Sequence, residues 1–290
     1  GRFLILGSAS MDLLQQSGES LAGRIEYVEM NGLDCLEIGG TSETLTQLWI
    51  RGGFPDSFLA ASEEDSLAYR RNFIRTYLER DVSQFSPRIP SQVLERLWTM
   101  IAHSQGGLLN SAGFGRSLSL TGKTITNYLD LLADLLLLRR LPPFFANTRK
   151  RLVKSPKIYV RDSGQLHALL GIGDFEKLAG HPVIGASWEG FVIENILSAA
   201  PDRTMASFYR TSAGAEIDLL LELPGYARPW AIEIKHSYAP KLGKGLHRAI
   251  EDTNPEKTFV VYGGTERFPL TERIEVIPLP DLCNLLASMK

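Results

Sequence analysis

The sequence predicts an α/β protein with a compact helical unit near its middle. Short apolar runs of strand length occur near both ends of the chain, for example at residues 3–6 and 230–235. Between them, residues 93–103 repeat their apolar positions at the spacing of an amphipathic helix. The two periodicities in one chain therefore predict a mixed fold in which an all-helical segment separates two α/β segments.

The composition limits the classes of protein to consider. A chain of 290 residues is long enough for two domains, or for three small ones. The hydrophobic content of 44% is ordinary for a globular protein, so sizeable cores are expected. The net charge is −2, so any binding to nucleic acid requires a local basic patch.

Cysteine usage and hydropathy predict a cytoplasmic protein without a membrane partner. The two cysteines, Cys35 and Cys283, lie far apart in the sequence, which fits a reducing compartment and excludes a disulfide framework. The longest apolar stretch, residues 128–138, is too short and too charged to span a bilayer. No signal peptide is visible at the N-terminus.

Turn-forming and apolar segments divide the chain into four predicted parts, which are residues 1–60, 61–90, 91–162 and 163–290. The first part resembles the end of an α/β domain. Because it opens on a core strand without an initiator Met, we expect the chain to be a piece of a longer protein. The second part is a connector built on one helix, and the fourth part alternates helices and strands.

Residues 91–162 predict a winged helix-turn-helix. Helices are expected at residues 93–103, 110–118 and 122–138, and strands at 144–148 and 157–160. The last of the three helices would be the recognition helix. Its first turns carry Lys123, Thr126 and Asn127, where contacts to bases or phosphates usually occur.

The connection between the two predicted strands of this unit is strongly basic. It carries Arg149, Lys150, Arg151 and Lys154, and Lys157 follows at the start of the second strand. Such a patch in an acidic protein is typical of phosphate contacts, so we expect it to bind DNA. Two alternatives stay open, because winged helices also bind proteins and because a basic hairpin can dock on an acidic neighbouring domain.

The residues that point to chemistry lie in the last third of the chain. Two strands are predicted at residues 216–222 and 230–235; Asp218 lies on the first, and Glu233 and Lys235 share one face of the second. If the strands are neighbours, the two carboxylates form a hard-oxygen site for Mg²⁺ or Mn²⁺. Lys235 would then orient a water molecule and stabilise phosphate charge.

A helix predicted at residues 187–199 adds a third acid to this group. On a helical wheel Glu189 falls within the apolar arc and Glu194 falls outside it. A carboxylate directed at the sheet must be neutralised or bound to a metal, so Glu189 is the predicted helical acid of the site. The plain alternative is that Glu-x-Lys on a strand is a solvated face with a weak ion pair.

Nearly the whole chain resembles a family of bacterial and archaeal AAA-type P-loop ATPases that have a C-terminal domain of unknown function. The likeness is carried by short motifs, such as Arg-Gly-Gly-Phe-Pro at 51–55 and Asp-Ser-Gly at 162–164. The most diagnostic motifs are Gly-Ala-Glu-Ile-Asp at 214–218 and Glu-Ile-Lys at 233–235. The resemblance implies a P-loop ATPase domain, a winged helix and a restriction-endonuclease-like domain of the PD-(D/E)XK type, in that order.

The same resemblance implies a nucleotide-binding portion that this chain lacks. No Gly-x-x-x-x-Gly-Lys-Ser/Thr occurs in it, so residues 1–60 would be the remnant of the ATPase domain. By similarity Ser8 looks like the polar sensor residue after a core strand, and Arg24 like an arginine that faces nucleotide or a partner. A capping serine and a surface arginine are the plain alternatives. Binding of ATP and homo-oligomerisation would belong to the intact protein.

Three functional hypotheses follow from these patterns. The first is an ATPase that acts on DNA and whose C-terminal portion holds a metal-dependent nuclease site. The second is a non-enzymatic DNA- or protein-binding module that regulates the ATPase and keeps the nuclease fold as a scaffold. The third is a toxin–antitoxin or defence component whose target is a protein.

The missing P-loop gives a direct prediction. The purified 290-residue chain should not turn over ATP, because it has no loop that cradles the β- and γ-phosphates. A phosphate-release assay with Mg²⁺ and ATP checks this, and sustained multiple turnover would contradict it.

Overall fold

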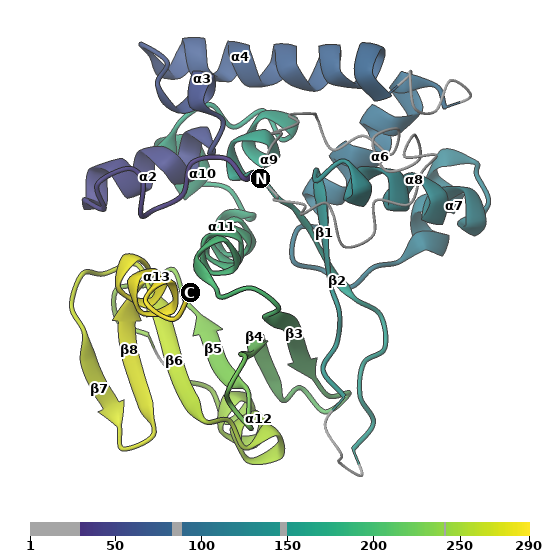
Figure 1. Ribbon diagram of the computed structural model, residues 1–290. Helices are drawn as coiled ribbons and strands as arrows, with labels where there is room; N and C mark the ends of the chain where they lie inside the picture. The colour runs from purple at the N-terminus through teal and green to yellow at the C-terminus, as the bar shows by residue number, and fades with distance from the viewer. Residues whose placement is uncertain (1–29, 83–88, 146–149, 241) are drawn as a thin grey trace, which may run out of the picture.

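A computed structural model describes residues 30–82, 89–145, 150–240 and 242–290 (Figure 1). The strand predicted at residues 3–6 lies outside these ranges. So do the predicted positions of Ser8, Arg24 and Arg149. Within the described ranges, no helix combines the length and the apolarity needed to cross a membrane.

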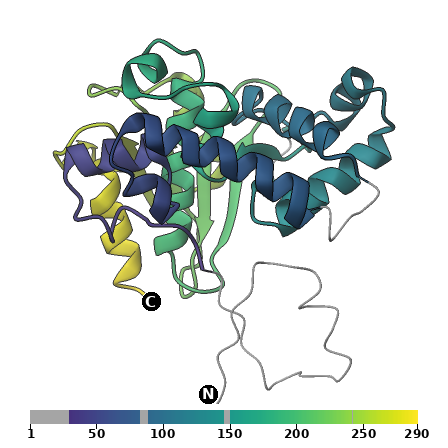
Figure 2. The same ribbon diagram turned by 90° about the horizontal axis from the view of Figure 1, so that it is seen from above.

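The chain enters the described part through helices. They are α2 (Ser42–Arg51), α3 (Pro55–Phe58) and α4 (Glu63–Thr76), and α4 continues as the π-helical turn η1 (Tyr77–Asp81). The caps follow the sequence, because the side chains of Thr41 and Ser62 accept from backbone N–H groups in the first turns of α2 and α4. Seen from above, α4 runs from α2 and α3 across to the helical unit (Figure 2).

The predicted helical unit is present with one change at its end. It consists of α6 (Ser91–His103), α7 (Ser111–Leu118) and α8 (Gly122–Asp134), followed by β1 (Leu138–Leu141) and β2 (Lys157–Val160). The helix expected to reach residue 138 stops at Asp134, because Leu136 adopts a positive φ of 59° that a helix cannot contain. The following residues then enter β1 instead.

The hairpin therefore differs from the predicted one. The strand that pairs with β2 is β1, antiparallel with Leu138 opposite Val160, and no strand is assigned to the described residues at 144–145. The long connection between β1 and β2 leaves the helical unit and reaches the C-terminal sheet. There Phe144 N donates to Phe208 O at 2.6 Å, and Val153 N donates to Arg210 O at 3.0 Å.

The C-terminal unit is a six-stranded mixed sheet between helices. Its helices are α9 (Ser163–Leu169), α10 (Phe175–Ala179), α11 (Ile184–Ala199), α12 (Lys244–Thr253) and α13 (Leu279–Ala287). Its strands are β3 (Met205–Arg210), β4 (Glu216–Glu222), β5 (Trp230–Ile234), β6 (Lys257–Tyr262), β7 (Phe268–Thr271) and β8 (Ile274–Pro278). The strand order is β3-β4-β5-β6-β8-β7. The pairs β3-β4 and β4-β5 are antiparallel, and β5-β6 and β6-β8 are parallel.

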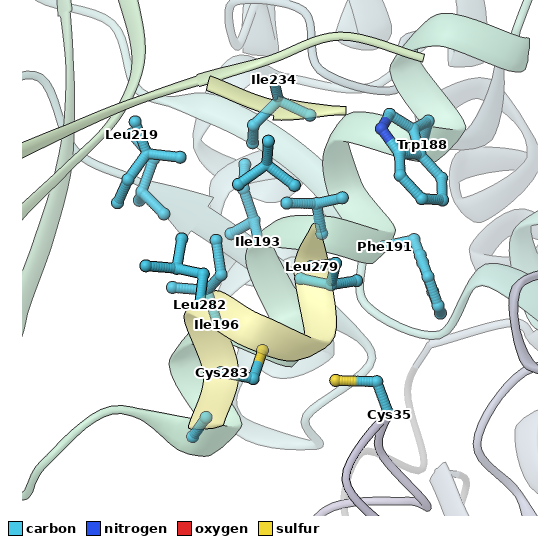
Figure 3. Close-up of a cluster of buried hydrophobic side chains, with 14 of the residues drawn as sticks. Cys35, Trp188, Phe191, Ile193, Ile196, Leu219, Ile234, Leu279, Leu282 and Cys283 are labelled. Atoms are coloured by element: carbon cyan, nitrogen blue, oxygen red, sulfur yellow. The ribbon is translucent and has the colours of Figure 1, made fainter. Parts of the chain in front are cut away.

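Apolar side chains cover both faces of this sheet. Helices α11 and α13 pack on one face, and α12 packs on the other through Leu246 and Ala249 (Figure 1). In the first of these cores, Ile196 of α11, Leu219 of β4 and Leu282 of α13 face one another (Figure 3). Because both faces are covered, the strands are almost continuously apolar, and the few polar residues on them stand out.

Residues 33–58 share this core. Cys35 lies beside Cys283 of α13 (Figure 3). Trp49 of α2 packs edge-on against Trp188 of α11 with ring centroids 5.1 Å apart. The described part of the first predicted segment is therefore helical and packs on the C-terminal unit, which the sequence did not indicate. That residues 1–60 derive from a P-loop ATPase domain stays a prediction.

The motifs Arg-Gly-Gly at 51–53 and Asp-Ser-Gly at 162–164 meet in space. Asp162 caps α9 by accepting from Gln165 N at 2.7 Å, and its other oxygen accepts from Gly53 N at 2.8 Å. A Cβ on Gly164 would overlap the carbonyl oxygen of Arg51, and one on Gly52 would overlap the carboxylate of Asp162. The glycines thus allow two backbone segments to touch, which is a structural reason for both motifs.

This close approach predicts the effect of one methyl group. Gly164→Ala should lower the free energy of unfolding by about 1–3 kcal/mol, because the methyl group must displace the backbone at Arg51. Gly185→Ala is the matched control, since its Cβ would meet nothing within 4 Å and the substitution suits a helix. Urea denaturation of the two variants tests this, and equal stabilities would contradict it.

Candidate active site

Asp218 and Glu233 face each other across two central strands. The antiparallel register pairs Leu219 with Ile232, so one step further it aligns Asp218 with Glu233. Asp218 is held in place because its Oδ2 accepts from Ile234 N at 2.9 Å. The two residues are only 8% and 9% exposed, so both carboxylates have lost most of their hydration.

Lys235 directly follows β5 and belongs to the same group. Its Nζ lies 2.6 Å from Glu233 Oε1. Burial lowers the pKa of Lys235, but the charges of Asp218 and Glu233 outweigh it and raise that pKa above its ordinary value. The Glu-x-Lys pair is therefore an ion pair at the edge of a buried cluster, rather than a solvated strand face.

Helix α11 directs Glu189 into this cluster and Glu194 away from it. Burial raises the pKa of Glu189, and the charge of Asp218 raises it further, which places the two carboxylates in one electrostatic group. Glu194 instead forms ion pairs with Arg139 and Arg161 of the helical unit, the second at 3.0 Å. Burial would raise the pKa of Glu194, but the two arginines outweigh it and lower that pKa.

The structure places in the carboxylate cluster a lysine that the sequence analysis counts among the basic residues of the predicted DNA-binding hairpin. Lys157, on β2, extends its ammonium group into the carboxylate cluster and is 3% exposed. Its Nζ lies 2.8 Å from Glu216, 2.9 Å from Glu189 and 3.7 Å from Asp218. Lys157 therefore does not belong to the exposed phosphate-contacting patch, because its charge is already matched inside the protein.

Tyr159 is a second residue that β2 contributes. Its hydroxyl group donates to Glu189 Oε1 at 2.6 Å, and this contact keeps the phenol protonated because the charge of Glu189 adds to the effect of burial in raising the pKa of Tyr159. The backbone of α11 comes close to this strand at Gly190, where a Cβ would press on the side chains of Gln105 and Tyr159.

The charges in this cluster are unbalanced. The carboxylates of Glu189, Glu216, Asp218 and Glu233 gather around the ammonium groups of Lys157 and Lys235. Burial raises the pKa of Glu233 to about 8, with a further increase from the charge of Asp218. The cluster therefore contains more carboxylates than ammonium groups, and its surroundings favour a compensating positive charge, whether a proton or a cation, beside Glu233.

The donor chemistry fits a hard divalent cation, but the geometry is not a finished metal site. Glu233 Oε2 is buried and has no hydrogen-bond partner, so an oxygen of the right type is available. In the part of the chain that the structure describes, however, no three His, Cys, Asp or Glu residues are arranged as a metal-binding group. The residues that could hold a cation are Asp218 and Glu233, with Glu189 beside them.

The remaining residues of the predicted DNA contact lie elsewhere. Lys123, Thr126 and Asn127 are exposed at the start of α8. In the connection, Arg151, Lys154 and Lys150 are all exposed, and Lys150 Nζ also lies 2.6 Å from Asp252 Oδ1 of α12. The sequence analysis left open that the basic hairpin docks on an acidic neighbouring domain. Lys150 and Lys157 make such contacts, because both form ion pairs with carboxylates of the C-terminal unit.

Two of the site residues that sequence reasoning missed differ in how they could have been found. Glu216 lies two residues before Asp218 on the same strand, so period-two alternation places both on one face. Lys157 carries no local signal, because a lysine in a basic hairpin has the same pattern whether it is solvated or buried. Only the docking of the hairpin on β3 distinguishes the two cases.

The comparisons with known proteins assign the two sides of this contact to two different domain families. Residues 184–282 match the domain of unknown function DUF4143. Residues 42–176 match a second domain of unknown function, DUF8612. Lys157 and Tyr159 thus belong to one matched region, and the acids and Lys235 to the other. The predicted boundary after residue 162 lies inside the first match.

Longer mycobacterial proteins resemble the whole chain. It is 46% identical over 295 residues to the uncharacterized protein Rv2008c of Mycobacterium tuberculosis, and equally to the uncharacterized protein Mb2031c of Mycobacterium bovis. The alignments cover 100% of this chain and 66% of each relative. No solved structure matches the chain.

Glu189 and Glu194 lie in different ion-pair groups, so substitution of Glu194 should affect stability rather than the candidate site. Glu194→Gln should lower the free energy of unfolding by about 2–4 kcal/mol, because it leaves Arg139 and Arg161 with less compensation at a largely buried position. Glu251→Gln, at an exposed position of α12, should change it by less than about 0.5 kcal/mol. Chemical denaturation checks both values, and a Glu194 variant as stable as the control would contradict the structural role.

Proposed function

We propose that the C-terminal unit holds a metal-dependent phosphodiesterase site of the PD-(D/E)XK type, in a protein whose intact form is an AAA-type ATPase that acts on DNA. The observation that carries the proposal is the alignment of Asp218 and Glu233 on adjacent buried strands, with Lys235 beside them. Such a pair of buried carboxylates needs a compensating cation, and an oxygen-rich site favours Mg²⁺ or Mn²⁺.

The order of the elements supports this proposal. Helix α11 precedes the antiparallel strands β3, β4 and β5, and α12 then leads to β6, which is parallel to β5. The acid lies on the second strand and Glu-x-Lys on the third, so the two most diagnostic motifs of the family resemblance lie on neighbouring strands. The match to a domain of unknown function agrees with the resemblance without assigning an activity.

Each residue has a defined role in the proposed reaction. Asp218 and Glu233 would hold the divalent ion, and Glu189 would assist directly or through a water molecule. The bound ion would supply Lewis-acid chemistry at a phosphodiester. Lys235 would orient the water that attacks the phosphorus and compensate the negative charge that develops on the phosphate oxygens.

The proposed nucleic-acid contact uses the residues whose charges remain exposed. Lys123, Thr126 and Asn127 form one group on α8, and Arg151 and Lys154 form a second in the connection. Exposed cations are suited to phosphate contacts because binding releases counterions. ATP binding and homo-oligomerisation are proposed for the intact protein, since this chain spans 66% of the length of its mycobacterial relatives.

One observation favours a second candidate function. The ammonium group of Lys157 already lies among the carboxylates, and no complete metal-binding group is formed by the described residues. A nuclease fold whose acids are neutralised by a lysine would be a scaffold. In that case the chain is a DNA- or protein-binding module that regulates the ATPase, with α8 and the exposed part of the connection as its contact surface.

Metal binding separates the two functions. Isothermal titration of the chain with Mn²⁺ and with Mg²⁺ should show one site, and both Asp218→Asn and Glu233→Gln should abolish it because each removes an oxygen ligand. Glu222→Gln, at the far end of the same strand as Asp218, should bind like the wild type.

The outcome also directs the next experiment. If the wild type binds metal and the two variants do not, cleavage of single-stranded, double-stranded and branched DNA should depend on the same residues. If the wild type binds no metal even with a DNA oligonucleotide present, the nuclease function is wrong and the binding module remains.

A further inference from the structure

The feature that neither function explains is a lysine from one unit inside the acid cluster of another. Lys157 is on β2, and its backbone is held by the helical unit, because Lys157 pairs with Leu141 of β1 and forms a bridge to Leu108. Its backbone is therefore fixed at the junction. From there the side chain passes the ring of Phe208, with Nζ 5.5 Å from the ring centroid, and ends among Glu189, Glu216 and Asp218.

We propose that Lys157 is a built-in counter-cation that competes with a divalent metal ion for the carboxylates and so sets the metal affinity of the site. The proposal rests on the proposed metal-dependent function. It makes Lys157 a positioning residue: in the metal-free protein its ammonium group holds Glu189 and Asp218 together, and metal binding requires that it withdraw.

The competition follows from where the ammonium group lies. Nζ is 2.9 Å from Glu189 and 3.7 Å from Asp218, two of the carboxylates that would surround the metal. A divalent ion bound to Asp218 would place two further positive charges within a few ångströms of Nζ, at largely buried side chains where charges are screened less than in bulk water. The two cations therefore cannot share these oxygens at the affinity that either would have alone.

The side chain can withdraw without unfolding the hairpin. A lysine reaches its partners through four flexible methylene groups, so Nζ can move while the backbone stays paired. Glu216 offers a position at the rim, because it is half-buried and also lies 3.5 Å from Arg210, which is partly exposed. Withdrawal toward Glu216 would release Glu189 and Asp218 while Lys157 keeps one of its ion pairs.

Removal of the lysine tests the competition. Lys157→Met keeps the apolar length of the side chain and removes its charge, so it should bind Mn²⁺ at least ~10-fold more tightly than the wild type. Lys177→Met is the control, because Lys177 is exposed on α10 and belongs to neither the proposed metal site nor the proposed nucleic-acid contact. Thermal melting in EDTA and in Mn²⁺ checks that the variant folds, and Mn²⁺ should raise its Tm more than that of the wild type.

A labelling experiment on the wild type does not depend on a variant that folds. An amine-reactive ester should acylate Lys157 slowly in EDTA, because the ammonium group is buried, and faster once Mn²⁺ occupies the site. Peptide mass spectrometry reads both Lys157 and Lys154, and Lys154 should react equally in the two conditions.

The results separate this inference from the function on which it rests. If the wild type binds Mn²⁺ but folded Lys157→Met binds no more tightly, or Lys157 labels equally with and without bound Mn²⁺, the competition is wrong and the metal site stands. If only Lys157→Met binds, the competition is supported. If neither protein binds, both the metal site and the competition are overturned.

Discussion

The ion pairs of Lys157 are the interaction on which the arrangement of this protein depends. A buried ammonium group is costly unless it is matched by charge, and here it is matched by three carboxylates on two different elements. The match requires β2 to lie against α11 and the long β1–β2 connection to lie along β3. The same contacts hold the acids of the C-terminal unit close together, so orientation of the units and formation of the site have one cause.

Further contacts between the units act in the same direction. Glu194, five residues beyond Glu189 on α11, is paired with Arg139 of β1 and with Arg161, which directly follows β2. Asp162, at the end of β2, joins the start of α9 to the turn at Gly53. Charged groups at the junction are thus paired across it. The two regions that match separate domains of unknown function also share one hydrophobic core, since Trp49 and Trp188 both belong to it.

The docking of the hairpin also changes how its basic residues can act. The positive charges of Lys150 and Lys157 are already partly compensated by carboxylates of the protein. The polar residues at the start of α8, and Arg151 and Lys154 in the connection, are exposed and can contact phosphate. Lys157 has its backbone in the hairpin and its ammonium group in the carboxylate cluster, so the hairpin and the proposed metal site are connected through it.

The sequence by itself determined the elements and most of the acids. Periodicity predicted α6, α7, α11 and the central strands, because amphipathic spacing and apolar runs depend on local geometry. Alternation placed Asp218, Glu233 and Lys235 together, and the apolar arc of α11 selected Glu189 over Glu194. Only the tertiary structure decided that Leu138 begins a strand, that residues 33–58 join the C-terminal core, and that Lys157 enters the acid cluster. These outcomes depend on contacts between segments far apart in the chain. The hydropathy or charge of a single residue does not specify which distant residue it will contact.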